Sequence, residues 1–63
     1  MNNKEIYPVV LKADDIAEIL GISLPTAYKL MRQKGFPLIS FGRNMRALRE
    51  EFFKWLEEQS QVS

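Results

Sequence analysis

Residues 24–49 carry six charged side chains, and all six are basic. The residues before this block have a net charge of −2 and those after it −3, so the whole chain has a net charge of only +1. Solvated surfaces usually mix the two signs, whereas a segment of one sign in a folded domain is typical of proteins that bind a polyanion. The chemistry that this block predicts is therefore the neutralisation of phosphates. Its cations are Lys29, Arg32, Lys34, Arg43, Arg46 and Arg49.

Catalytic chemistry has little support in the sequence. There is no histidine and no cysteine, which excludes disulfides, thiolate metal ligands, thiol nucleophiles and imidazole acid–base catalysis. Ser23, Ser40 and Tyr28 lack the neighbouring groups that activate a nucleophile. The acids within residues 14–18 fit a solvated helix face better than a catalytic pair, because nothing near them suggests a pocket. We expect a protein that is not an enzyme and that uses no cofactor and no metal.

The length of the chain limits its organisation. With 63 residues it can form one small domain, near the lower size limit for a stable hydrophobic core. We expect a single domain over residues 1–63, with an ordered core from about residue 7 to about residue 58 and frayed ends. No stretch approaches the roughly 20 apolar residues that span a bilayer, so we predict a soluble, cytoplasmic protein without membrane contact.

The first three cations fall on a predicted helix over residues 24–34. Ser23 has the short polar side chain that accepts a hydrogen bond from a free N–H group at a helix start, and Pro25 loses no helical hydrogen bond in the first turn. Gly35 can adopt the left-handed conformation that ends many helices, and Pro37 prevents continuation.

The helical period divides this helix into two faces. Ala27, Leu30 and Met31 lie on one face with the aliphatic stem of Lys34, and this face is expected to pack. The opposite face offers a phenol and two cations for recognition, although from this helix alone a solvated helix face is an equally good interpretation. Its residues are Pro25, Tyr28, Lys29 and Arg32.

A second predicted helix precedes the first. Residues 12–20 place two acids in the first turn, where the helix dipole favours anions, and supply an apolar face. Leu20, Gly21, Ile22 and Ser23 then join the two helices in a turn that is too short for anything but a tight connection. Glycine in such a turn is typical of a helix-turn-helix, and Ile22 is placed to fill the angle between the helices.

A β-hairpin is predicted to follow the basic helix. Residues 38–41 alternate, with Ile39 and Phe41 on one side, and residues 42–44 form the turn before a return strand over 45–48. Arginines at the tip and on the return strand suit a wing that lies along a phosphate backbone; an ordinary charged hairpin is the alternative. Near the start of the chain, residues 7–11 are either an edge strand or an extended lead-in.

The last predicted element is a helix that begins near Arg49. Phe52, Trp55 and Leu56 recur at helical spacing, and such large side chains are needed to complete the core of a domain this small. Phe53 falls off this stripe, and we expect it to be the most exposed aromatic residue. The tail from Gln59 onward is expected to fray.

Four segments in this order resemble the small excisionase-type, MerR-like winged helix-turn-helix family. The resemblance extends from about Leu11 to Leu56, and the order and spacing of the segments make it specific although each alone is common. The segments are Asp15–Ser23, Thr26–Met31, the Gly42–Arg43 turn with Arg46 after it, and Phe52 with Trp55–Leu56.

This resemblance implies a winged helix-turn-helix fold that is mainly α with a small β-hairpin. It further implies that residues 24–34 enter the major groove of double-stranded DNA and that the hairpin around residues 42–46 contacts the neighbouring backbone or minor groove. The function implied is that of an excisionase-like directionality factor of a phage or mobile element, acting with an integrase or recombinase and with further copies of itself on adjacent sites. A small transcriptional regulator is the alternative. The candidate DNA-binding residues are Leu24, Pro25, Thr26, Tyr28, Lys29, Arg32, Arg43, Asn44 and Arg46.

The sequence also departs from the family pattern. Lys12 stands where a hydroxyl residue usually caps the first helix, so only the Asp15 half of a capping box can form. Leu24 and Pro25 replace polar or basic residues, which predicts more apolar base contacts, for instance with a thymine methyl group. Ala47 is small for a core position on the return strand.

A function of another class is also compatible with the sequence. Phe53, Met45 and the acidic last helix could dock a partner protein in a module that has lost DNA binding. Binding to DNA with a strong salt dependence favours the DNA-binding interpretation over this one.

Overall fold

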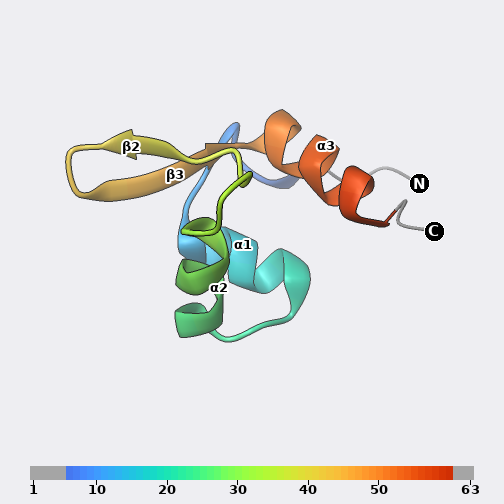
Figure 1. The fold of residues 1–63 in the computed structure, drawn as a ribbon, viewed down its shortest axis with the longest axis horizontal. Coiled ribbons are helices and arrows are strands. Elements are labelled where there is room, and N and C mark those ends of the chain that lie inside the picture. Colours follow the sequence, from blue (N-terminus) through green and yellow to red (C-terminus); the bar gives the residue numbers. More distant parts are fainter. Residues whose placement is uncertain (1–5, 61–63) are drawn as a thin grey trace.

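The computed structural model describes residues 6–60 and forms three helices and a small three-stranded antiparallel sheet (Figure 1). The predicted winged helix-turn-helix fold is thereby confirmed. Expectations about residues 1–5 and 61–63 lie outside the described residues. The elements are β1 (Val10–Leu11), α1 (Ala13–Leu20), α2 (Leu24–Met31), β2 (Ile39–Phe41), β3 (Asn44–Leu48) and α3 (Arg49–Ser60).

Helix α1 is capped at its start by Asp15 and ended by Gly21. The Asp15 carboxylate accepts a hydrogen bond of 3.0 Å from the backbone N–H of Lys12, whereas the Lys12 side chain makes no capping bond, as the half capping box predicts. At the other end Gly21 adopts a left-handed φ of 66°, and the N–H of Ile22 donates to the carbonyl of Ala17 at 3.0 Å. This turn leads directly to α2.

Helix α2 ends three residues earlier than predicted, at Met31 instead of Lys34. The N–H of Gln33 donates to the carbonyl of Leu30, three residues earlier, at 3.1 Å, which is the pattern of a 3₁₀ turn and not of an α-helix. Lys34 lies in the turn that follows. The early end of the helix has a physical reason: the chain must turn after Met31 so that the Phe36 side chain is buried in the core before the first hairpin strand begins.

Strand β3 is the centre of the sheet, with the order β1-β3-β2. Leu11 pairs with Ala47, so the chain near residues 7–11 does form an edge strand, although only two residues long. Phe41 pairs with Asn44, which makes Gly42–Arg43 a two-residue turn and moves Asn44 from the predicted turn into the strand. Gly42 has a φ of 61°, a value that suits glycine.

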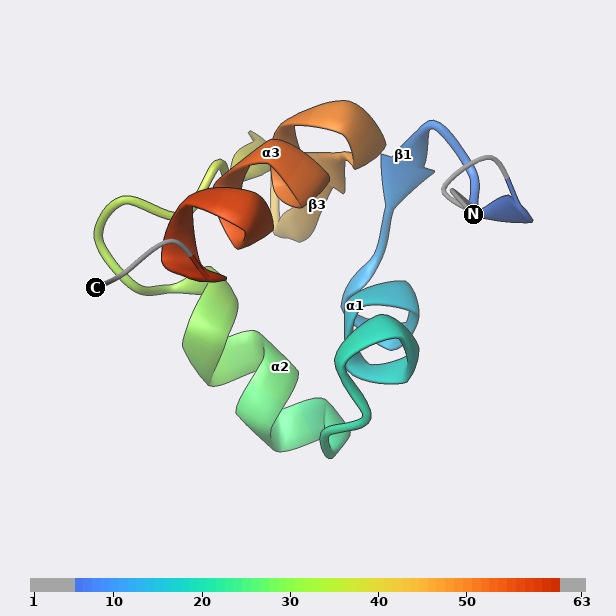
Figure 2. The same cartoon turned by 90° about the vertical axis from the view of Figure 1, so that its right-hand side faces the viewer.

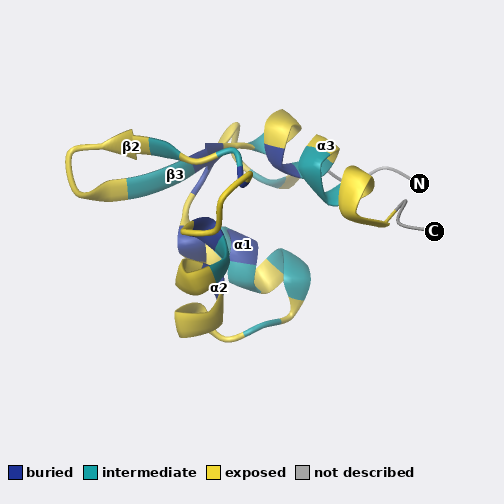
Figure 3. Cartoon of the chain, in the orientation of Figure 1, coloured by how far each residue is buried: buried dark blue, intermediate teal, exposed yellow. Residues whose placement is uncertain are grey.

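The core lies where the helices meet the base of the hairpin (Figures 2 and 3). The Phe36 ring lies 5.0 Å from that of Trp55 and 6.0 Å from that of Phe52, measured between centroids. Ala47 is fully buried beside its equally buried strand partner, so a small residue fits this position. The buried residues are Leu11, Ala13, Ile16, Ala27, Met31, Phe36, Ala47 and Phe52.

One expectation about the last helix is wrong. Phe53 is half-buried, with its ring 5.3 Å from that of Phe52 and 6.5 Å from that of Tyr7, because the segment before β1 folds back onto the start of α3. The helix continues through Gln59 to Ser60, whose hydroxyl donates to the carbonyl of Glu57 at 2.8 Å. The fraying expected from Gln59 onward stays a prediction.

Phe52→Ala tests this description of the core. Removing a fully buried phenylalanine should lower the free energy of unfolding by about 3–5 kcal/mol. That is about all the stability that one core of this size supplies, so the variant should be largely unfolded in circular dichroism and urea titration.

Phe41→Ala is the matched control, because the same substitution at an exposed position should change stability by less than about 0.5 kcal/mol. A Phe52→Ala variant that unfolds at the urea concentration of the wild type would contradict the assignment of Phe52 to the core.

Candidate nucleic-acid interface

The start of α2 is held by its N-terminal cap. The Ser23 hydroxyl accepts from the N–H of Thr26 at 3.4 Å and lies 2.8 Å from the Thr26 hydroxyl, and Pro25 occupies the first turn. Ala27 and Met31 are buried, so the inner face of the helix is fixed against the core. The outer face is therefore presented on a rigid element.

The division of α2 into two faces is confirmed with one exception. Lys34 does not add its stem to the packed face, because it lies beyond the helix end and is exposed. Leu24 and Tyr28 retain 40% and 37% of their surface in solvent, which is a large apolar area for a short helix. The exposed residues of the outer face are Leu24, Pro25, Thr26, Tyr28, Lys29 and, at the C-cap, Arg32.

The side chains of this outer face differ in how far contacts within the domain already restrict them. The Arg32 guanidinium lies over the Tyr28 ring at 5.8 Å from its centroid, a contact that limits where both groups can move. The Thr26 hydroxyl is shared with Ser23, so it takes part in the cap and keeps only its remaining hydrogen-bonding capacity for a ligand. The Lys29 side chain makes no hydrogen bond or ion pair within residues 6–60.

The hairpin carries the other three candidates. Arg43 is exposed in the two-residue turn, and its side chain makes no hydrogen bond or ion pair to the described residues; Asn44 is exposed beside it. Arg46 is half-buried, and its Nη1 donates to the carbonyl of Met45 at 2.9 Å, so part of its guanidinium is already used. Figure 3 shows the tip of the hairpin exposed and its base buried.

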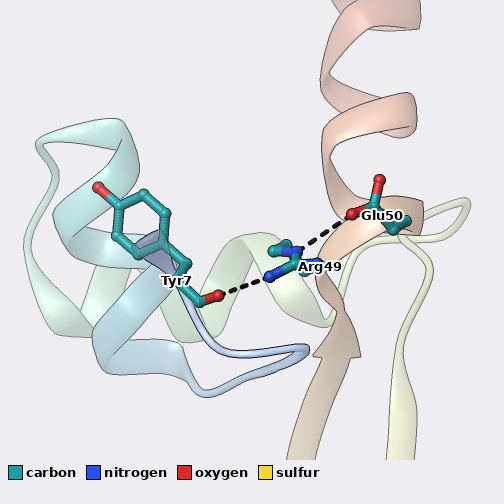
Figure 4. Close-up of polar contacts among 3 residues, drawn as sticks. All are labelled: Tyr7, Arg49 and Glu50. Carbon is teal, nitrogen blue, oxygen red and sulfur yellow. Dashed lines mark hydrogen bonds and ion pairs between the residues drawn. The ribbon is translucent and has the colours of Figure 1, made fainter. Parts of the chain in front are cut away.

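Arg49 belongs to the fold and not to the exposed basic surface. Its Nη1 donates to the Tyr7 carbonyl at 2.8 Å, and its Nε pairs with the Glu50 carboxylate at 3.1 Å (Figure 4). Its backbone N–H donates to the carbonyl of Val9 at 2.7 Å. The side chain is only 15% exposed, so one of the six cations of the basic block stabilises the junction of β3 and α3.

The sequence prediction misses one exposed aromatic residue. Phe41 is placed by alternation on the same side as Ile39, yet 57% of its surface is exposed while Ile39 is half-buried. The last residue of β2 stands beyond the reach of the helices, since the hairpin projects from the body of the domain (Figure 1). The position of Phe41 directly before the Gly42 turn is the signal in the sequence that could have indicated its exposure.

The hairpin projects to the left in Figure 1, and α2 lies below its base. All acids among the described residues lie on α1 and α3, so α2 and the hairpin carry cations and no carboxylate. The candidates on α2 and those on the hairpin form separate patches, and within residues 6–60 no side-chain hydrogen bond or ion pair joins them. The acids are Asp14, Asp15, Glu18, Glu50, Glu51, Glu57 and Glu58.

Other kinds of site have less support. A shallow, open pocket of about 210 Å³ lies beside α3 and mixes acidic, basic and apolar residues. Within the described part of the chain no group of three potential metal ligands comes together. None of the helices described is long and apolar enough to cross a membrane. The pocket is lined by Gly35, Pro37, Glu51, Lys54, Trp55 and Glu58.

Arg49→Met and Arg43→Met make the same chemical change at two arginines of the basic block, and we expect opposite results. Arg49→Met loses a charged hydrogen bond to the Tyr7 carbonyl and should lower the free energy of unfolding by about 1–3 kcal/mol. Arg43→Met should change stability by less than about 0.5 kcal/mol and should weaken binding to a DNA duplex.

Urea titration and fluorescence anisotropy at a temperature where both variants are folded measure the two effects. Equal losses of DNA affinity in both variants would contradict the assignment of Arg49 to the fold.

The match to a family model agrees with this geometry. Residues 10–60 match the model of a helix-turn-helix domain, which spans β1 to α3. Comparisons with curated proteins and with solved structures return no significant match. The matched part includes the helix-turn-helix formed by α1, the Gly21 turn and α2, and also the hairpin. The chain therefore belongs to the family of helix-turn-helix DNA-binding domains.

Proposed function

We propose that this domain binds double-stranded DNA sequence-specifically, with α2 in the major groove and the hairpin on the adjacent backbone or minor groove. The observation that carries the proposal is that α2 and the hairpin bear exposed cations and no acids, while every acid of the described residues lies on α1 or α3. A helix fits the major groove of B-DNA, and cations on both elements complement the flanking phosphates.

The exposed side chains divide by chemistry into two sets. Lys29, Arg32, Arg43 and Arg46 neutralise phosphates, with Asn44 as a further hydrogen-bonding group on the hairpin. Within α2, Thr26 and Tyr28 contact the backbone or base edges. Leu24 and Pro25 contact thymine methyl groups, for which their exposed apolar surface at the helix start is suited.

The biological role that we propose is that of an excisionase-like directionality factor acting with an integrase. The support is the resemblance of the segments that form α1, α2, the hairpin and α3. One domain of this size contacts few base pairs, so useful specificity requires adjacent copies or a partner protein. A small transcriptional regulator would use the same surface. The protein-interaction alternative is less favoured, because Phe53 and Met45 both pack against the core.

The salt dependence of binding tests the DNA-binding surface. The four cations predict a slope of log affinity against log salt concentration of about −3.6, measured by fluorescence anisotropy on a mixed-sequence duplex. Arg43→Ala should reduce the magnitude of the slope by about 1, whereas Lys54→Ala, which removes a cation from α3, should leave it unchanged. Binding that does not respond to salt would refute the proposal.

A separate experiment tests the proposal that copies of the domain bind adjacent DNA sites and assist one another. On duplexes that carry one or two copies of a site selected from a random-sequence library, the second copy should raise the affinity per site by about five- to hundredfold. Analytical ultracentrifugation gives the stoichiometry and anisotropy the affinity. Independent binding to the two sites would contradict mutual assistance between copies and would favour a regulator that depends on another partner.

A further inference from the structure

Phe41 is the most exposed aromatic residue among residues 6–60, at 57% against 37% for Tyr28. It is the last residue of β2 and pairs with Asn44 across the Gly42–Arg43 turn, so its position is set by the strand ladder at the hairpin tip. It belongs neither to the buried core nor to the partly buried residues packed around it. Folding therefore does not explain a large apolar side chain at this position.

The surroundings of Phe41 indicate what kind of surface it meets. The residues next to it along the chain and across the ladder are Ser40, Gly42 and Asn44, and the exposed Arg43 follows in the turn. A protein-docking surface of useful size needs a contiguous apolar patch, which this tip lacks. A single aromatic ring beside an unpaired cation is instead complementary to nucleic acid, which combines phosphates with the flat faces of bases.

The shape of the hairpin is compatible with entry into a groove. Phe41 and Asn44 pair across a two-residue turn, so the tip of the hairpin is small. The minor groove of B-DNA is about 6 Å wide, so a single side chain of this tip enters it while the two strands stay outside. The hairpin also projects away from the helices, so its tip can advance without a collision of α1 or α3 with the duplex (Figure 1).

We propose that Phe41 inserts its ring at a base step in the minor groove next to the site of α2, unstacks that step and bends the DNA. This inference rests on the proposed function, because α2 must first position the hairpin on the duplex. Apolar side chains that enter the minor groove act as such wedges, and pyrimidine–purine steps open at the lowest cost. Such a wedge kinks the duplex toward the major groove and opens the minor groove, and Arg43, beside the ring, neutralises a phosphate at the edge of the opened groove.

The experiment uses a duplex selected by the wild-type protein from a random-sequence library. Single 2-aminopurine substitutions at successive positions report unstacking as a rise in fluorescence, and dyes at the two ends report bending by energy transfer. Wild-type protein should raise the fluorescence at one step and shorten the end-to-end distance. Phe41→Ala should abolish both signals and weaken binding by roughly five- to hundredfold, while the slope of affinity against salt stays that of the wild type.

Leu38→Ala is the matched control, because it removes an exposed apolar side chain, 37% exposed, from the segment that enters the hairpin but not from its tip. This variant should keep both signals. If wild-type protein binds with the expected salt dependence but unstacks no base, or if Phe41→Ala keeps the signals, the wedge is refuted and the proposed function stands. If the wild type shows no salt-dependent binding, the proposed function fails and the wedge fails with it.

Discussion

The packing of Phe36 against Phe52 and Trp55 is the interaction on which the arrangement of this domain depends. Phe36 lies between α2 and β2, whereas the other two rings belong to α3, so the contact joins the middle of the chain to its last helix. To bury Phe36, the chain must leave the helical path after Met31. The same turn directs the following residues into the hairpin. The length of α2 and the direction of the wing therefore follow from one apolar contact.

The basic block divides its cations between folding and binding. Arg49 holds the start of the described chain to α3, and Arg46 gives one of its nitrogens to a backbone carbonyl of its own strand. The remaining cations lie on α2, in the turn after it and at the hairpin tip, where solvent surrounds them. A count of charges along the sequence treats all six as equal, whereas their partners show that they are not.

Local chemistry accounts for what the sequence could predict. The Ser23 cap, the Gly21 turn and the apolar period of each helix depend only on neighbours in the chain. Both helices begin where these signals place them, although α2 ends earlier than predicted. Contacts between residues far apart in the chain could not be predicted from these local signals. The pairing of Leu11 with Ala47 completes the sheet, and the return of Tyr7 to α3 buries part of Phe53. The exposure of Phe41 likewise depends on how far the hairpin extends from the body, which alternation alone does not reveal.

The direct passage from β3 into α3 has a mechanical consequence. Leu48 ends the strand and Arg49 begins the helix, with no loop residue between them. A loop would act as a hinge and absorb a tilt of the wing. Here the backbone N–H and the guanidinium of Arg49 also donate to the carbonyls of Val9 and Tyr7, so the start of α3 is fixed to the chain on either side of the junction. The angle between the wing and the last helix is therefore set at this one residue.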